Sequence, residues 1–244
     1  MLIALLADIH ANREALERCL AHARAHHAER WIFLGDYVGY GADPEWVVET
    51  IREYVSAGAV ALLGNHDAAV GERRETMSLP AQTAIEWTRG QLDATHRAFL
   101  AGLPLTFEED GCLFLHADAA APRRWGYITG SEDATRSMRA ASCRMIFCGH
   151  VPQPAVYNLS DLWKLTAFRP VTGVGVPLLS RRRWLAVLGS VGQPRDGNPA
   201  ASYAMLDTRK NELTFFRVPY DVEAAAAKIR KAGLPEILAD RLRS

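Results

Sequence analysis

Short apolar runs in the first 64 residues alternate with segments whose apolar residues recur every three or four positions. The runs, which we expect to form buried strands, are Leu2–Ala7, Trp31–Leu34 and Ala59–Leu63. Between them, Asn12 can cap a helix that extends to about His27, and Pro44 can open a second helix. This order predicts a parallel sheet with right-handed crossovers.

The pattern changes in the rest of the chain. A hairpin is expected around Asp110 and Gly111, and helices are expected over Pro80–Leu100, Ser131–Ala141, Asp221–Lys231 and Pro235–Leu242. Further strands are expected at Arg144–Cys148, Ala155–Leu159, Leu162–Ala167, Arg183–Leu188, Ser202–Leu206 and Leu213–Val218. Because Gly, Pro, Asn and Asp divide these short strands, the second half favours a mixed or antiparallel sheet.

Composition limits the functions that this chain can have. It has 244 residues, of which 49% are apolar, so it can bury a sizeable core. Lys plus Arg and Asp plus Glu both number 28, and this balance argues against dedicated nucleic-acid binding. Leu2–Ala7 is too short to span a membrane, and no basic segment precedes it. The four cysteines have no CxxC spacing, so we expect a cytoplasmic protein with reduced thiols.

Polar side chains follow five of the apolar strands. They are Asp8 and His10, Asp36, Asn65 to Asp67, His116, and His150. One such residue alone is as well explained by a helix cap or a hydrogen-bonded core histidine. Ligands of open α/β sheets bind at the carboxyl ends of the strands, and five polar ends together indicate a site there.

The donor types indicate a metal site. Carboxylate, carboxamide and imidazole suit Mn²⁺, Fe or Zn²⁺, and no thiolate site is visible. Asp36 comes from a central strand with other donors on both sides, which makes it the best candidate to bridge two ions. A shared carboxylate holds two ions roughly 3.5–4 Å apart, the spacing used in two-metal hydrolysis at phosphorus.

These motifs resemble, in order, those of the calcineurin-like metallophosphoesterase superfamily: Asp8-x-His10, Gly35-Asp36, Gly64-Asn65-His66-Asp67, His116 and Gly149-His150. The stretches GDYVGYGADP at 35–44 and GSVGQPRDGNPAASYAMLD at 189–207 look like its small prokaryotic phosphodiesterase or diadenosine-tetraphosphatase-like branch. The resemblance covers nearly the whole chain. It implies one domain over residues 1–244, a four-layer α/β/β/α sandwich of two mixed β-sheets flanked by helices.

The resemblance also implies ligand roles and cofactors. Asp8, His10 and Asp36 would hold a first metal ion, and Asp36, Asn65, His116 and His150 a second. One or two divalent ions, with Mn, Fe, Zn and Ni as candidates, would form the centre. A metal-bound hydroxide would then attack phosphorus. His66 would be catalytic together with Asp36, facing the scissile ester as a protonated group. The alternative for His66 is a structural histidine bonded to Asp67.

The sequence departs from the family pattern after His150. The family has Gly-His-x-His there, whereas this chain has Gly149-His150-Val151-Pro152, and proline offers no donor atom. The neighbouring Gln153 would point to the other face of an extended segment, and a water could fill the vacancy; the sequence leaves open whether Gln153 or water replaces the missing ligand. We therefore expect weaker occupancy of the first metal position. Loss of activity with retention of the fold is the alternative.

Three residues are candidates for contacts with a small phosphorylated substrate, nucleotides included. Arg195 could bind phosphate through its planar guanidinium, and Tyr37 and Tyr40 could stack on a nucleobase. For each, a surface or packing role is the alternative. The leading hypothesis is a metal-dependent hydrolase of a phosphodiester, a dinucleoside polyphosphate or a phosphomonoester. A metal- or nucleotide-binding module on the same scaffold is the second.

Overall fold

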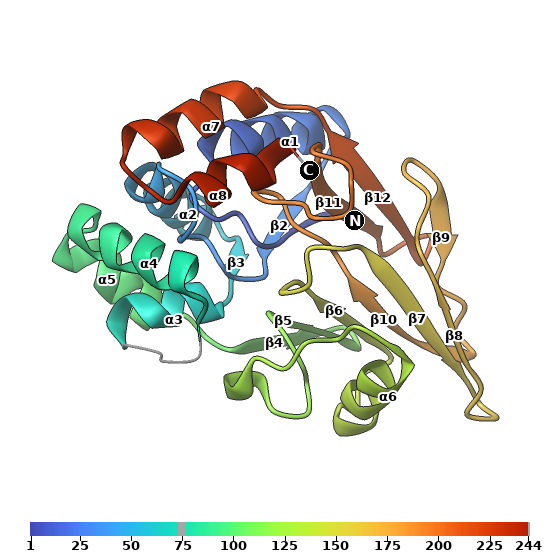
Figure 1. Ribbon diagram of the computed structural model, residues 1–244. Coiled ribbons are helices and arrows are strands. Elements are labelled where there is room, and N and C mark those ends of the chain that lie inside the picture. Colours follow the sequence, from blue (N-terminus) through green and yellow to red (C-terminus); the bar gives the residue numbers. More distant parts are fainter. Residues whose placement is uncertain (73–76, 244) are drawn as a thin grey trace.

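Two mixed β-sheets pack face to face in the computed structural model (Figure 1). The structure describes residues 1–72 and 77–243, and over these residues each sheet has six strands. The first sheet has the order β3 (Val60–Ala61), β2 (Arg30–Phe33), β1 (Leu2–Leu6), β11 (Ala201–Asp207), β12 (Glu212–Val218) and β9 (Gly175–Pro177). The second has the order β4 (Thr106–Glu109), β5 (Cys112–Leu115), β6 (Met145–Cys148), β10 (Arg182–Val187), β7 (Ala155–Ser160) and β8 (Leu165–Phe168).

Eight helices lie among the described residues. They are α1 (Arg13–Ala25), α2 (Pro44–Ser56), α3 (Asn65–Gly71), α4 (Leu79–Gln91), α5 (Ala94–Ala101), α6 (Ser131–Ala140), α7 (Val222–Lys231) and α8 (Glu236–Asp240). Short 3₁₀ turns occupy Pro122–Arg124 and Arg241–Arg243. Figure 1 shows α1, α2, α7 and α8 on the side of the first sheet and α6 against the second. No helix of the described residues combines the length and apolar character that a membrane crossing requires.

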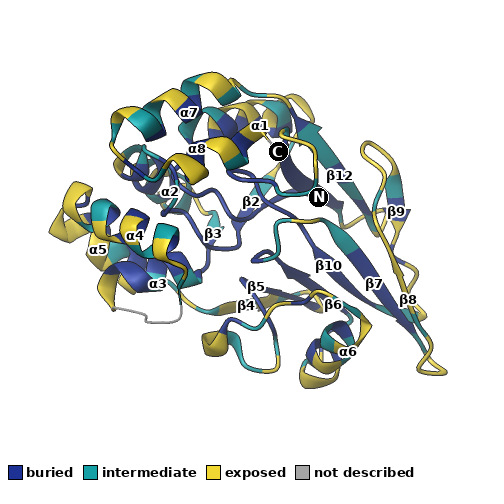
Figure 2. Cartoon of the chain, in the orientation of Figure 1, coloured by how far each residue is buried: buried dark blue, intermediate teal, exposed yellow. Residues whose placement is uncertain are grey.

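Strand β1 is covered on both faces, by the second sheet on one side and by helices on the other. Its alternate side chains face two different cores: Ile3 and Leu5 pack between the sheets, while Ala4 and Leu6 pack against α1 and α2. A strand covered on both faces has apolar residues at every position, and this produces the continuous run in the sequence. Figure 2 shows these central strands as buried and the outer faces of the helices as exposed.

The second sheet is covered in the same way. Phe114 and Phe147 stack in the core between the sheets, with ring centroids 5.2 Å apart. On the opposite face, Ala134 and Met138 of α6 pack against Ile146. The layers therefore run helix, sheet, sheet, helix, and this confirms the predicted four-layer α/β/β/α architecture.

Three elements differ from the prediction. The third strand is only Val60–Ala61, shorter than expected, and β9 was not predicted. Helix α3 begins at Asn65, inside a motif whose polar residues concealed the start of a helix. The prediction for α1 is confirmed, because the side chain of Asn12 accepts a hydrogen bond from the backbone N–H of Ala15.

The topology brings the carboxyl ends of several strands to one rim. Strands β1 and β2 are parallel neighbours in the first sheet, and β5 and β6 are parallel neighbours in the second. Hydrogen bonds join the two sheets at this rim: the backbone N–H of His150 donates to Oδ2 of Asp8 at 2.8 Å, and the ring of His116 contacts the carbonyl oxygen of Leu34 at 2.8 Å. The loops that follow these strands therefore meet.

Candidate metal centre

The polar residues that follow the strands converge at this rim. Asp8, His10, Asp36, His66, His116 and His150 are buried there, and Asn65 is half-buried. They come from loops after β1, β2, β5 and β6 and from the first turn of α3. The structure thus brings together every residue that the sequence analysis proposed as a ligand.

One group of acceptors surrounds Nε2 of His116. This nitrogen lies 3.1 Å from Oδ1 of Asn65, 3.1 Å from Nδ1 of His150 and 3.4 Å from Oδ2 of Asp36. The other ring nitrogen, Nδ1, lies 2.8 Å from the carbonyl oxygen of Leu34 and donates to it. Such a backbone contact fixes the ring and leaves Nε2 as the ligand atom.

A second group surrounds Nε2 of His10. This atom lies 3.8 Å from Oδ1 of Asp8 and 3.9 Å from Oδ2 of Asp36. Its Nδ1 lies 3.3 Å from the carbonyl oxygen of Val38, which again leaves Nε2 facing the carboxylates. Ligand atoms of His10, Asp36 and His66 lie within 4.8 Å of one another, so His66 is also within reach of a cation here.

Asp36 belongs to both groups, through the same oxygen, Oδ2. Its other oxygen, Oδ1, accepts the backbone N–H of His66 at 2.8 Å. Its own N–H donates to Oδ2 of Asp67 at 2.8 Å. The carboxylate of Asp36 is therefore held at a fixed place between the two groups.

Four of the candidate ligands have a left-handed backbone. Asp8, His10, Asp36 and His150 have φ angles of 55°, 50°, 57° and 65°. This conformation costs roughly 1–2 kcal/mol for each residue other than glycine. The surrounding fold therefore supports a strained arrangement that turns these side chains toward one another.

The charges and protonation states of the side chains at the candidate metal centre are compatible with a bound divalent cation. Burial raises the pKa of Asp8 to about 7 and lowers the pKa of His10 well below its usual value. Burial also lowers the pKa of His116, but the carboxylates of Asp36 and Asp8 and the carbonyl oxygen of Leu34 together outweigh this effect and raise the pKa to about 9. A proton on Nε2 of His116 would thus hold the acceptors together, and a divalent cation can take its place.

Pro152 and Gln153 lie in the loop that follows His150. Gln153 is exposed, and its Nε2 donates to the carbonyl oxygen of Arg195 at 3.1 Å, so its side chain is engaged with that loop. Pro152 is half-buried and brings no donor atom. His10, Asp8 and Asp36 thus form the first group without a further histidine from this loop.

The proposed substrate residues separate into two classes. Tyr40 lies at the site, with its ring 4.6 Å from the rings of both His10 and His66, and the guanidinium of Arg195 lies 5.2 Å from the Tyr40 centroid. The prediction for Tyr37 is wrong. This side chain is fully buried, and its hydroxyl hydrogen-bonds the carbonyl oxygen of Leu62 at 2.8 Å, so no ligand can stack on it.

Two features of His66 also correct the sequence interpretation. Asp67 does not bond its ring: both carboxylate oxygens accept backbone N–H groups, those of Asp36, Tyr37, Val38 and Gly64. Nδ1 of His66 is buried without a hydrogen-bond partner among the described residues. The ring is instead held by packing against Tyr40 and His10.

Tyr127 is a site residue that the sequence analysis missed. Its ring stacks on that of His150, with centroids 4.1 Å apart and planes 22° apart, and 60% of the residue remains exposed. No motif marks it. Its only hint is an aromatic residue in a Gly-containing loop that follows His116.

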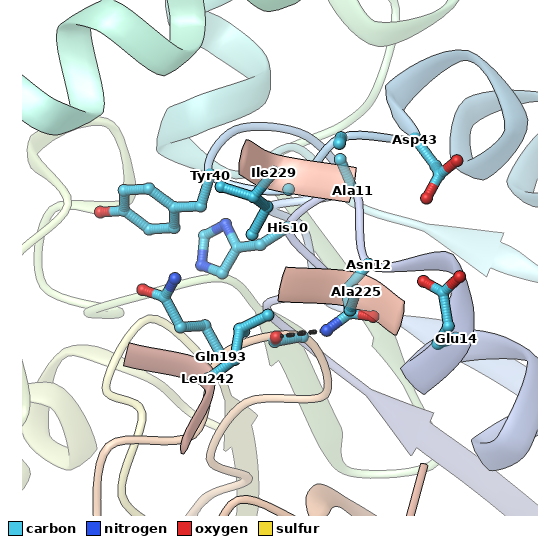
Figure 3. Close-up of a pocket in the computed structure, with 13 residues that line it drawn as sticks. His10, Ala11, Asn12, Glu14, Tyr40, Asp43, Gln193, Ala225, Ile229 and Leu242 are labelled. Carbon is cyan, nitrogen blue, oxygen red and sulfur yellow. Dashed lines mark hydrogen bonds between the residues drawn. The ribbon is translucent and has the colours of Figure 1, made fainter. Parts of the chain in front are cut away.

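A small cavity lies behind His10 (Figure 3). Tyr40 and Gln193 line it on one side, and Glu14 and Asp43 line the opposite side, as Figure 3 shows. Its volume of about 10 Å³ leaves room for about one water molecule.

Known proteins resemble this chain over nearly its full length. The model of the calcineurin-like phosphoesterase superfamily domain matches residues 1–211. An uncharacterized protein of Methanocaldococcus jannaschii is 33% identical over 249 residues, which cover 99% of this chain and 97% of that protein. The structure of a metallophosphoesterase from Sphaerobacter thermophilus is 34% identical, with a TM-score of 0.87 and coverage of 99% of this chain and 98% of the other. A hypothetical protein from Pyrococcus horikoshii shares the fold, with a TM-score of 0.81, 18% identity and coverage of 99% and 97%.

Proposed function

The chain belongs to the calcineurin-like phosphoesterase superfamily and is a metal-dependent phosphoester hydrolase, and on this premise we propose that it cleaves a small phosphodiester at a two-cation centre bridged by Asp36. Dinucleoside polyphosphates and phosphomonoesters are the other substrates that such a centre can serve. The single observation that carries the proposal is the position of Oδ2 of Asp36, 3.9 Å from Nε2 of His10 and 3.4 Å from Nε2 of His116.

Each group would hold one cation. Asp8, His10 and Asp36 would form the first position, and Asp36, Asn65, His116 and His150 the second. Bound divalent ions such as Mn²⁺, Fe²⁺, Zn²⁺ or Ni²⁺ supply Lewis acidity toward phosphoryl oxygens and lower the pKa of water.

The protein's own groups position and protonate the substrate. His66 would act on the leaving oxygen, and two observations support this role: its ring lies beside that of His10, and its Nδ1 has no hydrogen-bond partner among the described residues. Burial lowers the pKa of His66. The negative charge of a phosphodiester bound close to the ring opposes this effect and favours the protonated form, which can donate a proton to the leaving group.

Arg195 would bind a phosphate oxygen. Gln193 is buried, and its Oε1 accepts hydrogen bonds from Nε and Nη2 of Arg195 at 3.2 and 2.6 Å, so the guanidinium has a fixed orientation over Tyr40. A planar guanidinium held in this way can present its remaining N–H groups to phosphate. Tyr40 would shape the entrance beside it.

Pro152 supports a second candidate function. Without a donor from that position, the first group has three protein ligands, and water would complete the coordination. We expect this position to fill at higher metal concentration than the second. A catalytically weakened metal- or nucleotide-binding module is therefore the alternative.

A combined measurement of metal loading and turnover distinguishes the hydrolase from the binding module. Protein freed of metal is titrated with Mn²⁺, Ni²⁺, Fe²⁺ or Co²⁺, and bound metal and hydrolysis of bis-p-nitrophenyl phosphate are measured together. We expect hydrolysis to rise with occupancy, to be lost in Asp36→Asn and to persist in Asp161→Asn, which changes an exposed carboxylate. Filled sites without turnover of bis-p-nitrophenyl phosphate would favour the binding module.

A further inference from the structure

We propose that a cleft on the outer face of β7 and β8 is the binding site for a planar aromatic group of the phosphorylated ligand, a ring of nucleobase size. This inference rests on the proposed function, because it takes the phosphate of that ligand to lie at the centre around Asp36. It adds a binding site about 250 Å³ in volume that lies outside the candidate ligands.

The cleft has apolar walls and a polar rim. Tyr157 and Ala167 are paired neighbours on β7 and β8 and share one face, while Ile128 and Val151 supply the facing loops. Tyr157 is buried and Ala167 is exposed, so the cleft has an aromatic side chain at its floor and an open side.

Polar groups stand at the edge of this cleft. Arg169, Gln153 and Thr129 also line it, and all three are exposed. Apolar walls with polar groups at the rim match a flat heteroaromatic ring, which has apolar faces and hydrogen-bonding edges. An arginine at the rim can also lie over such a ring.

The cleft is lined by residues that directly follow Tyr127 and His150 at the candidate metal centre. Val151 directly follows His150, and Ile128 directly follows Tyr127, whose ring stacks on His150 at 4.1 Å. Gln153 joins the other side, because it donates to the carbonyl oxygen of Arg195. A ligand with its phosphate at His150 therefore reaches the cleft by passing beside Tyr127.

On the other side of the candidate metal centre, behind His10, the cavity is too small for an aromatic ring. Beyond His10 and Tyr40, the cavity in Figure 3 has a volume of only about 10 Å³. Ala225 and Ile229 of α7 close it, and Glu14 and Asp43 add two carboxylates that are paired with Lys228 at 2.6 and 2.8 Å. An aromatic group does not fit there, whereas the cleft beside β8 accepts one.

The test compares AMP with ribose 5-phosphate, which has the same phosphate and sugar without the base. Metal-loaded protein is used, and the dissociation constant is measured by calorimetry, or KM where the ligand is hydrolysed. We expect AMP to bind about tenfold more tightly, the effect of stacking one base. Ala167→Trp fills the cleft from an exposed position and should abolish this preference while leaving ribose 5-phosphate unchanged.

Thr166→Trp is the matched control. Thr166 is exposed on the same strand, but successive side chains of a strand point to opposite faces, and it does not line the cleft. This variant should keep the preference for AMP. If Ala167→Trp fails to fold, Ala167→Leu narrows the same space. Equal affinity for AMP and ribose 5-phosphate in the unmodified protein, or a preference that survives filling of the cleft, would overturn the inference. Absence of hydrolysis alone would count only against the proposed function.

Discussion

Nε2 of His116 lies 3.1 Å from Nδ1 of His150, although the two residues end different strands and are 34 positions apart. Two ring nitrogens at this distance repel each other through their lone pairs unless a cation or a proton lies between them. Both belong with Asp36 to a buried group whose ligand atoms lie within 4.8 Å of one another. This contact makes the second of the two proposed cation positions the better defined.

Replacing His116 should therefore empty that position. We expect His116→Ala to lower the affinity for Mn²⁺ and the rate of phosphodiester hydrolysis at least about 100-fold, since loss of groups that only orient a ligand already costs 10- to 100-fold. Metal content is measured by mass spectrometry after dialysis. His26→Ala removes an exposed histidine at the C-cap of α1 and should leave both quantities unchanged. Equal metal content in the two variants would contradict the assignment.

Gly39 provides a test of His66 that leaves the candidate ligands in place. A Cβ on residue 39 would approach Nδ1 of His66 far more closely than real side chains allow, and Gly39 has a φ of 84°. We expect Gly39→Ala to displace the ring and lower kcat by about 100-fold, within the range attributed to a general acid, while metal content stays close to that of the unmodified protein.

Gly58→Ala controls for backbone strain. Gly58 has a φ of 97°, but a Cβ there would meet nothing within 4 Å. Both variants should lose stability because alanine disfavours positive φ, and only Gly39→Ala should lose activity. A similar loss of kcat in both would mean that strain, and not displacement of His66, is responsible.

Asp67 should matter for stability more than for metal binding. One of its oxygens accepts the backbone N–H groups of Asp36 and Gly64 at 2.8 and 2.9 Å, so it joins the loops after β2 and β3. In Asp67→Asn, an amide NH₂ must replace one of the two accepting oxygens and face N–H donors. We expect the free energy of unfolding of the metal-free protein to fall by about 3 kcal/mol, as for loss of hydrogen bonds to a charged group.

Chemical denaturation by urea measures this change. Asp161→Asn serves as the reference, because Asp161 is exposed in the turn between β7 and β8 and its change should be within about 0.5 kcal/mol of zero. A neutral effect of Asp67→Asn would show that the backbone N–H groups of residues 36–38 and 64 find other partners.

The elements that the sequence predicted best are those whose pattern depends on burial alone. Leu2–Leu6 and Met145–Cys148 are covered on both faces, so their apolar runs mark both the strands and the positions where polar residues begin. Asp8 and His150 could be placed at one rim because carboxyl ends of parallel strands meet. The α/β/β/α layers followed from the family resemblance, which the fold confirms.

Tyrosines in the loops could not be placed in this way. Tyr37 follows Asp36 in a Gly-containing stretch that is typical of a surface loop, yet its hydroxyl bonds the carbonyl oxygens of Phe33 and Leu62 inside the core. Tyr127 stacks on His150, a residue 23 positions further along the chain. Both outcomes depend on contacts between distant segments, which no local pattern encodes.

Pro152 offers a gain-of-function test of the incomplete position. We expect Pro152→His to add a ligand near Asp8 and His10, so that the first cation position fills at about tenfold lower Mn²⁺ concentration, the lower end of the effect of one coordinating or orienting group. Calorimetric titration of metal-free protein measures the two binding events. The affinity of the second cation position, around His116, should not change. Gln153→His is the matched control: it places the same ring one residue further on, where the side chain turns toward the backbone of Arg195. Two variants with the same metal affinity would mean that position 152 does not face the first cation position, and the interpretation of the gap would then be wrong.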